Sequence, residues 1–141
     1  ELYQMSELTL NSLLVPSKEI EVDYPGLDGF KVKLAFLSRE ELIKIRKKAT
    51  KIVFKNRQPS DEFNEELFLK LYVDAVVKGW FGLKYKYLNE LVLVDLSKVK
   101  DMEACLDFSV ENALLLMKNS TEFDAFISET ISDLQAFTKT S

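Results

Sequence analysis

Few side chains in this sequence could carry out catalysis. Histidine is absent and Cys105 is the only cysteine, so the commonest general base and metal ligand are missing and an intramolecular disulfide is excluded. The carboxylates with the most suggestive spacing are Glu66 and Asp74, which share one stripe of a predicted helix with Lys70. At spacings of four these charges can pair with one another at the surface. Because no nucleophile or glycine-rich loop accompanies them, we expect no enzyme activity, no cofactor and no metal.

A stripe of lysines is the second chemical feature. The segment 39–58 holds eight Lys and Arg against two Glu, a balance of +6 in a chain whose net charge is −4. Such a basic face can meet nucleic acid or an acidic protein surface, or it can remain solvated. The acidity of the whole chain and the lack of a recognisable nucleic-acid-reading motif favour the solvated face. We therefore predict no nucleic-acid partner.

Composition limits the class of protein. Apolar residues make up 47% and charged residues 30% of the 141 residues, which is typical of a folded globular chain. No apolar run approaches the roughly 20 residues that cross a bilayer, and no secretory signal pattern is present. We expect a cytosolic protein without a membrane partner. Residues 1–17 are leucine-rich without a clean period and are predicted to form a flexible arm, before a single globular domain over 18–141.

The fold predicted for this domain is α+β, with helices dominant. Residues 18–37 alternate apolar and polar side chains on both sides of a Pro-Gly turn, which predicts a β-hairpin whose apolar face the helices cover. Capping residues and apolar periodicity predict about four helices. A long connection of poor periodicity, 84–107, separates the first two from the last two. The predicted helices span residues 39–54, 61–78, 110–118 and 122–138.

The most apolar of these helices is expected to end at Gly79, since glycine is favoured just past the last turn. Gly79 and Gly82 bracket Trp80 and Phe81. Trp80, the only tryptophan, can lie in the core at the helix end or be exposed as an anchor for a partner. Both positions remain open from the sequence.

The last predicted helix has a core stripe of aromatic and aliphatic residues and an unusual opposite side. Small residues there fall within one arc and would let another helix, from a partner or a second copy, approach closely. The same residues can equally be ordinary surface. They are Ala125, Ser128, Ser132 and Ala136.

Several motifs together carry a resemblance to a known family. The chain contains Gly79-Trp80-Phe81-Gly82-Leu83, then a polar cap before Asn112-Ala113-Leu114, and finally a helix that includes Phe123 and Phe137. In this order they resemble the tail assembly chaperones of long-tailed bacteriophages. The resemblance covers the chain from about residue 18. The insert between Lys84 and Glu103 is longer than the linker expected in many members.

The resemblance implies a non-enzymatic role in virion assembly. It implies a chaperone that binds and solubilises the tape measure protein, promotes assembly of the tail tube protein around it, and is absent from the mature virion. The expected partners are these two proteins and a further copy of the chain, in the cytoplasm of the infected bacterial host. The alternative is a structural tail or connector protein that is retained in the virion.

Overall fold

The computed structural model describes residues 8–133, and the predicted α+β class is confirmed within them. Five strands form two small antiparallel sheets, and six α-helices and one short 3-10 helix accompany them. The sheets contain three strands and two strands. Only the three-stranded sheet contributes to the hydrophobic core.

The predicted hairpin over 18–37 is present. Strands β1 (Ser17–Asp23) and β2 (Lys31–Leu37) pair antiparallel in register across their whole length. An unpredicted third strand, β5 (Val77–Phe81), pairs with the other side of β2, with an irregularity between Lys33 and Leu34. The hairpin is therefore stabilised by a distant strand as well as by helices.

The predicted helix over 61–78 is wrong at both ends. The observed helix α3 is Glu65–Val76, and the chain continues directly as β5. Gly79 lies in that strand opposite Lys33 and does not end a helix. The extended backbone lets Val77 and Trp80 pack into the core, and this tertiary burial outweighs local helix propensity.

The predicted helix over 39–54 is also too long. Helix α2 (Arg39–Lys48) ends after ten residues, and a second hairpin follows that the sequence analysis did not predict. Its strands are β3 (Thr50–Lys55) and β4 (Gln58–Phe63). Asn56 and Arg57 both have positive φ, 52° and 68°, as the favoured two-residue hairpin turn requires. The lysine spacing continued the helical period into β3 and concealed this turn.

The two last helices begin where the sequence predicts. Helix α5 (Val110–Asn119) matches the segment 110–118, whereas α6 (Thr121–Ser132) ends before the predicted residue 138, because Asp133 caps it in a non-helical conformation. The side chain of Ser120 is buried and accepts a hydrogen bond from the Phe123 amide at 3.0 Å, which fixes the start of α6. The described part of the predicted arm contains the one-turn helix α1 (Leu10–Leu13), whose side chains are exposed, and its last residue, Ser17, already belongs to β1.

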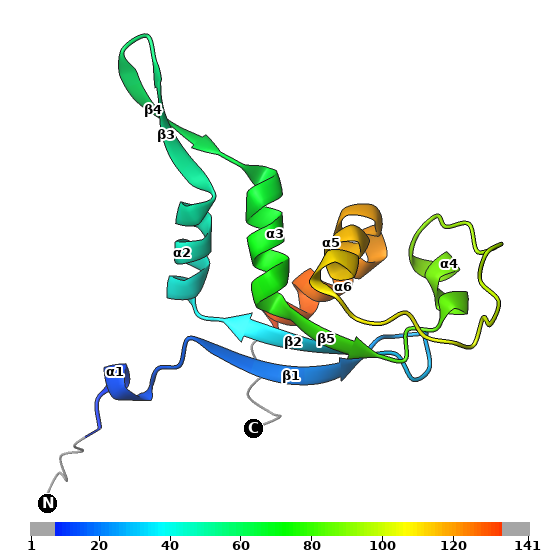
Figure 1. The fold of residues 1–141 in the computed structure, drawn as a ribbon. Helices are drawn as coiled ribbons and strands as arrows, with labels where there is room; N and C mark the ends of the chain where they lie inside the picture. The colour runs from blue at the N-terminus through cyan, green and yellow to red at the C-terminus, as the bar shows by residue number, and fades with distance from the viewer. Residues whose placement is uncertain (1–7, 134–141) are drawn as a thin grey trace, which may run out of the picture.

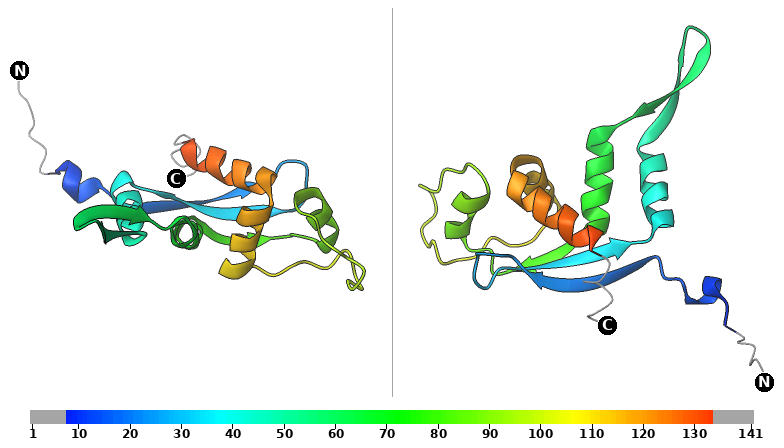
Figure 2. Two further views of the ribbon diagram at one scale, coloured as in Figure 1. Left: turned by 90° about the horizontal axis from the view of Figure 1, so that it is seen from above. Right: turned by 180° about the vertical axis from the view of Figure 1, so that it is seen from behind.

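Figures 1 and 2 show how these elements extend from the sheet. Helices α2 and α3 stand side by side on it, and the β3–β4 hairpin continues beyond them, away from the sheet. The segment after β5 contains the 3-10 helix η1 (Tyr85–Tyr87) and helix α4 (Leu88–Leu91). It lies at the end of the sheet opposite α1.

The core lies between the sheet and helices α3, α5 and α6. Each large side chain removed from water there contributes about 1.5–3 kcal/mol. No residue of α2 belongs to this core. The largest fully buried apolar side chains are Phe30, Phe123, Leu34, Leu83 and Ile127.

Gly82 is the glycine that the fold requires most strictly. It has φ +73°, and a Cβ there would overlap the carbonyl oxygen of Gly29. We expect Gly82→Ala to lower the free energy of unfolding by more than about 2 kcal/mol, because backbone strain and a backbone clash add. Urea denaturation followed by Trp80 fluorescence measures this loss.

Gly26→Ala is the matched control. Gly26 has a similar φ of +82°, with nothing within 4 Å of an added Cβ. It should cost only the left-handed strain, about 1–2 kcal/mol. Equal losses for the two variants would contradict the close packing of Gly82 against Gly29.

Candidate partner-binding surface

An open hollow between α4 and α5 is a concave surface with a largely apolar lining. It has a volume of about 320 Å³ and is lined mainly by aliphatic side chains. Leu93 is fully exposed at its rim, and Leu115 is 51% exposed. We name this surface the aliphatic hollow. Its lining residues are Leu88, Val92, Leu93, Val94, Leu106, Asn112, Leu115, Leu116 and Asn119.

The wall on the α4 side is built by the insert that follows β5. Leu88 and Leu91 are buried and fix α4 against the core. The chain then turns outward at Val92 and exposes Leu93 and Val94. The opposite wall is α5, where Leu116 faces the core and Leu115, one position earlier on the helix, faces the hollow.

Two amide side chains line the hollow, and both amide nitrogens are already used within the chain. Asn112 Nδ2 donates to the Asp107 carbonyl at 3.2 Å, and Asn119 Nδ2 donates to the Leu115 carbonyl at 2.8 Å. Asn112 therefore holds the end of the insert against α5. The surface that remains suits an apolar ligand better than a polar one.

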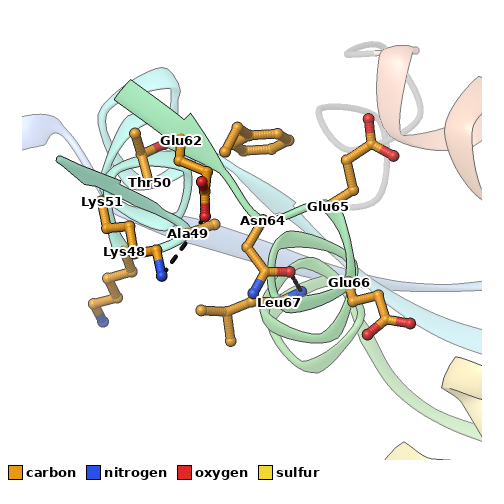
Figure 3. Close-up of a pocket in the computed structure, with 10 residues that line it drawn as sticks. Lys48, Ala49, Thr50, Lys51, Glu62, Asn64, Glu65, Glu66 and Leu67 are labelled. Atoms are coloured by element: carbon orange, nitrogen blue, oxygen red, sulfur yellow. Dashed lines mark hydrogen bonds and ion pairs between the residues drawn. The ribbon is translucent and has the colours of Figure 1, made fainter. Parts of the chain in front are cut away.

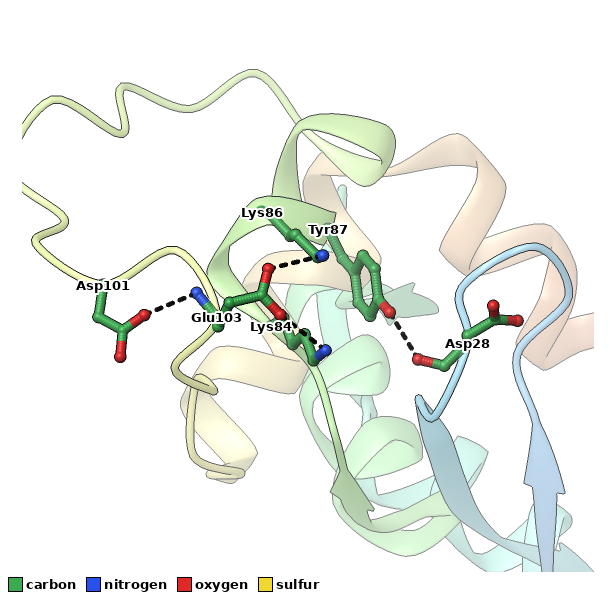
Figure 4. Close-up of polar contacts among 6 residues, drawn as sticks. All are labelled: Asp28, Lys84, Lys86, Tyr87, Asp101 and Glu103. Atoms are coloured by element: carbon green, nitrogen blue, oxygen red, sulfur yellow. Dashed lines mark hydrogen bonds and ion pairs between the residues drawn. The ribbon is translucent and has the colours of Figure 1, made fainter.

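Ionic contacts hold the two ends of the insert together, as Figure 4 shows. The Glu103 carboxylate bridges Lys84 Nζ at 2.9 Å and Lys86 Nζ at 2.7 Å. Tyr87 Oη donates to the Asp28 carbonyl at 2.6 Å, which ties η1 to the turn between β1 and β2. The insert is thus anchored at its base while Leu93 projects from its outer part.

The same contacts set the electrostatics of the insert. Hydrogen bonds from Lys86 and Lys84 lower the pKa of Glu103 to about 2. The Glu103 partner in turn raises the pKa of Lys84. These groups are exposed to water, so the contribution of the bridge to stability is modest and sensitive to salt.

Trp80 from the family-like motif lies in the core and does not form part of an exposed surface. It is 5% exposed, and its indole nitrogen donates to the Leu106 carbonyl at 2.9 Å. Leu83 is fully buried. Phe81 lies on the opposite face of β5 from Trp80 and is exposed. Gly79 lies in β5, and Gly82 makes the tight approach to Gly29.

The remaining predicted site residues are not gathered in one place. Asn112 lines the aliphatic hollow, and Phe123 is fully buried in the core. Phe137 and Ala136 lie outside the described residues. The other members of the predicted small-residue face, Ala125, Ser128 and Ser132, are exposed on α6.

A second hollow lies at the base of the β3–β4 hairpin (Figure 3). It has a volume of about 500 Å³ and carries charges of both signs. Lys48 and Lys51 line it on the α2 and β3 side, and Glu65 and Glu66 line it at the start of α3, with their carboxylates directed away from the two lysines. Its polar and mixed lining makes it a poorer site for an apolar partner than the aliphatic hollow.

Comparisons of the chain with protein-family models, with curated proteins and with solved structures find no match. The surface is therefore interpreted from its geometry and chemistry. Within residues 8–133, no helix combines the length and the apolar character needed to cross a bilayer. In the same part of the chain, no group of three or more His, Cys, Asp and Glu could hold a metal ion.

Sequence reasoning missed the residues that form the aliphatic hollow. Leu93 and Val94 belong to the short apolar run 91–94, which lies inside the connection of poor periodicity and carries no sequence signal of exposure. Leu115 is one of three consecutive leucines, and three adjacent positions on a helix cannot all face one side. That run was the available signal that α5 has a second apolar face.

Glu103→Gln tests whether the ionic bridge orders the insert. The pKa of Glu103 is lowered in the folded chain, so its contribution is complete above about pH 4.5 and is lost as pH falls toward about 2. At pH 6 the variant should show faster amide exchange at Tyr85 and Lys86, which donate to Ala104 and Met102. NMR-detected hydrogen exchange, expressed as protection factors, measures this effect.

Glu90→Gln, at an exposed α4 position, is the control and should leave these protection factors unchanged. The wild type should approach the Glu103→Gln behaviour as pH falls below 4.5. Equal protection in the wild type and Glu103→Gln at pH 6 would show that the bridge does not order the insert.

Proposed function

We propose that this chain is a tail assembly chaperone of a long-tailed bacteriophage and acts in the cytoplasm of the infected host. In this proposal it binds the tape measure protein, keeps it dissolved, and helps the tail tube protein assemble around it. It performs no catalysis and leaves before the virion is complete. The aliphatic hollow is the single observation that carries the proposal, because it offers an apolar docking surface outside the core.

The hollow has the chemistry that an amphipathic helix requires. A helix that lays its apolar stripe into a groove inserts side chains at intervals of three or four residues. Leu88, Leu106 and Leu116 supply an aliphatic floor, and Leu93 and Leu115 supply exposed contacts at the edge. A long helical protein with exposed apolar stripes, as the tape measure protein is expected to be, would gain solubility when such a surface covers it.

The small size of the aliphatic hollow is consistent with later release of the partner. Nine residues line the hollow, whereas a stable interface of standard size involves roughly 20–30 residues on each side. A partner bound mainly there can be displaced when tube subunits offer more contact area. The same surface would be harder to reconcile with permanent retention in the virion.

Co-expression with the tape measure protein encoded nearby tests the proposal. We expect a complex that can be purified and a soluble partner that aggregates when expressed alone. The complex should persist at high salt, because apolar contacts are not screened by ions. A partner that remains insoluble, with nothing recovered alongside this chain, would contradict the proposal.

Leu115→Asp tests the aliphatic hollow within the same experiment. Burying one leucine contributes about 1.5–3 kcal/mol, so its loss should weaken the complex at least about tenfold. Ile43→Asp on α2 is the matched control, since Ile43 is also partly exposed, at 42%, and lies away from the hollow. Calorimetric titration with a tape measure fragment distinguishes the two variants.

The alternative, a structural tail or connector protein, is tested in particles. Mass spectrometry of purified mature virions should detect no copies of this chain under our proposal. Stoichiometric copies in the virion would favour the structural role.

A further inference from the structure

The β3–β4 hairpin is exposed on both faces. No residue from Thr50 to Phe63 is buried, and Ile52 and Phe54 are 66% and 74% exposed. A lone two-stranded hairpin is at best marginally stable in water. This one is held at its base, where Arg46 lies over the rings of Phe63 and Phe68. Its outer part has the backbone geometry of a sheet but lacks a third strand.

The two edges of this hairpin differ in their capacity to accept that strand. The Asn64 amide donates to the Ala49 carbonyl at 2.8 Å, and the register continues from this pair to Lys55 opposite Gln58. Hydrogen-bonded and non-hydrogen-bonded pairs alternate along an antiparallel ladder. The backbone groups of Ile52 and Phe54 on β3 therefore point away from β4.

On β4 the corresponding outward positions are Pro59 and Asp61. Proline has no amide hydrogen to donate, and charged side chains on an edge oppose strand addition. The outer edge of β4 is therefore blocked. The outer edge of β3 remains open, with Ile52 and Phe54 presenting both donors and acceptors.

Side chains on β3 specify the chemistry of a strand added there. Ile52 and Phe54 occupy one face, whereas Lys51 and Lys55 occupy the other. Lys51 already has a contact with Glu62 at 3.6 Å. Within residues 8–133, Lys55 and the turn residue Arg57 are not among the ion pairs.

We propose that the outer edge of β3 binds an extended segment of a partner protein in which acidic and apolar residues alternate. The added strand pairs with the backbone of Ile52 and Phe54. Its apolar side chains contact those two residues, and its carboxylates face Lys51 and Lys55. This is strand addition to an open edge, and it goes beyond the proposed function because it uses a different surface from the aliphatic hollow.

A foreign segment fits this edge better than a second copy of the chain. Strand β1 also alternates acidic and apolar residues, but its side chains are already used. Ile20 is buried in its own core, Glu19 pairs with Lys33 at 3.3 Å, and Asp23 lies 3.9 Å from Lys31. Strand β1 of a second copy is therefore not free to add to this edge.

A synthetic peptide that alternates Glu and Val tests the proposal, with an alternating Lys and Val peptide as the charge control. NMR titration of the whole chain should show the acidic peptide perturbing Ile52 and Phe54. Hydrogen exchange at these two amides should slow at least about tenfold when the peptide is saturating. The Lys peptide should bind at least about twofold more weakly.

Three variants distinguish the contribution of the backbone edge of β3 from the contribution of the lysine charge to peptide binding. Phe54→Pro removes the outward donor, as Pro59 does on β4, and should abolish binding. Lys55→Glu retains the backbone edge and should weaken binding of the acidic peptide about twofold to fivefold. Lys98→Glu makes the same charge change in the insert and should have no effect. Core amide signals establish that each variant is folded.

Several outcomes would overturn the proposal. These are absence of peptide binding, binding that perturbs residues outside the hairpin instead, and equal affinity for the acidic and basic peptides. A concentration-dependent dimer that protects Ile52 and Phe54 without peptide would assign the edge to a second copy. Because Leu115→Asp leaves the hairpin intact, failure at the hollow and failure at this edge are distinguishable.

Discussion

The placement of Trp80 is the interaction on which the rest of the structure depends. Its strand joins the hairpin as β5, and its ring packs edge-on against Phe30 just before β2, Phe123 from α6 and Phe108 before α5. Its indole nitrogen donates to Leu106 at the end of the insert. One side chain thus connects the sheet, the insert and the last two helices. A buried indole needs a hydrogen-bond partner. The bond from Trp80 therefore fixes the position of Leu106, where the insert comes back to the core.

The two proposed partner surfaces lie on elements that are attached to this core but leave apolar side chains exposed outside it. The insert begins and ends beside Trp80 and can expose Leu93 because Leu88 and Leu91 hold it from beneath. The β3–β4 hairpin lies beyond α2 and α3 and contributes nothing to the buried cluster. Apolar side chains there cost solubility in the free protein, and in both proposals a partner covers them. In this proposal, the insert and the β3–β4 hairpin extend from a compact core and bind a partner transiently.

The sequence was sufficient where local signals agreed with the tertiary structure. Alternation predicted β1 and β2, and capping residues predicted the starts of α2, α5 and α6, where Ser38, Ser109 and Ser120 are the N-caps in the structure. It failed for β5, because the extended backbone there depends on burial in the core and on pairing with β2, in which Val77 lies opposite Leu34, 43 positions away. It failed for β3, since Asn56 and Arg57 are a less familiar turn pair than Asn-Gly. The aliphatic hollow could not be predicted, because it depends on how an irregular insert folds back onto α5.

Hydrogen exchange on the complex with the tape measure protein tests the central claim most directly. The account predicts that binding slows exchange in residues 88–94 and 112–119, the two walls of the aliphatic hollow, while core strands β2 and β5 change little. A stable complex in which both walls exchange as fast as in the free protein would contradict the account and place the partner site elsewhere.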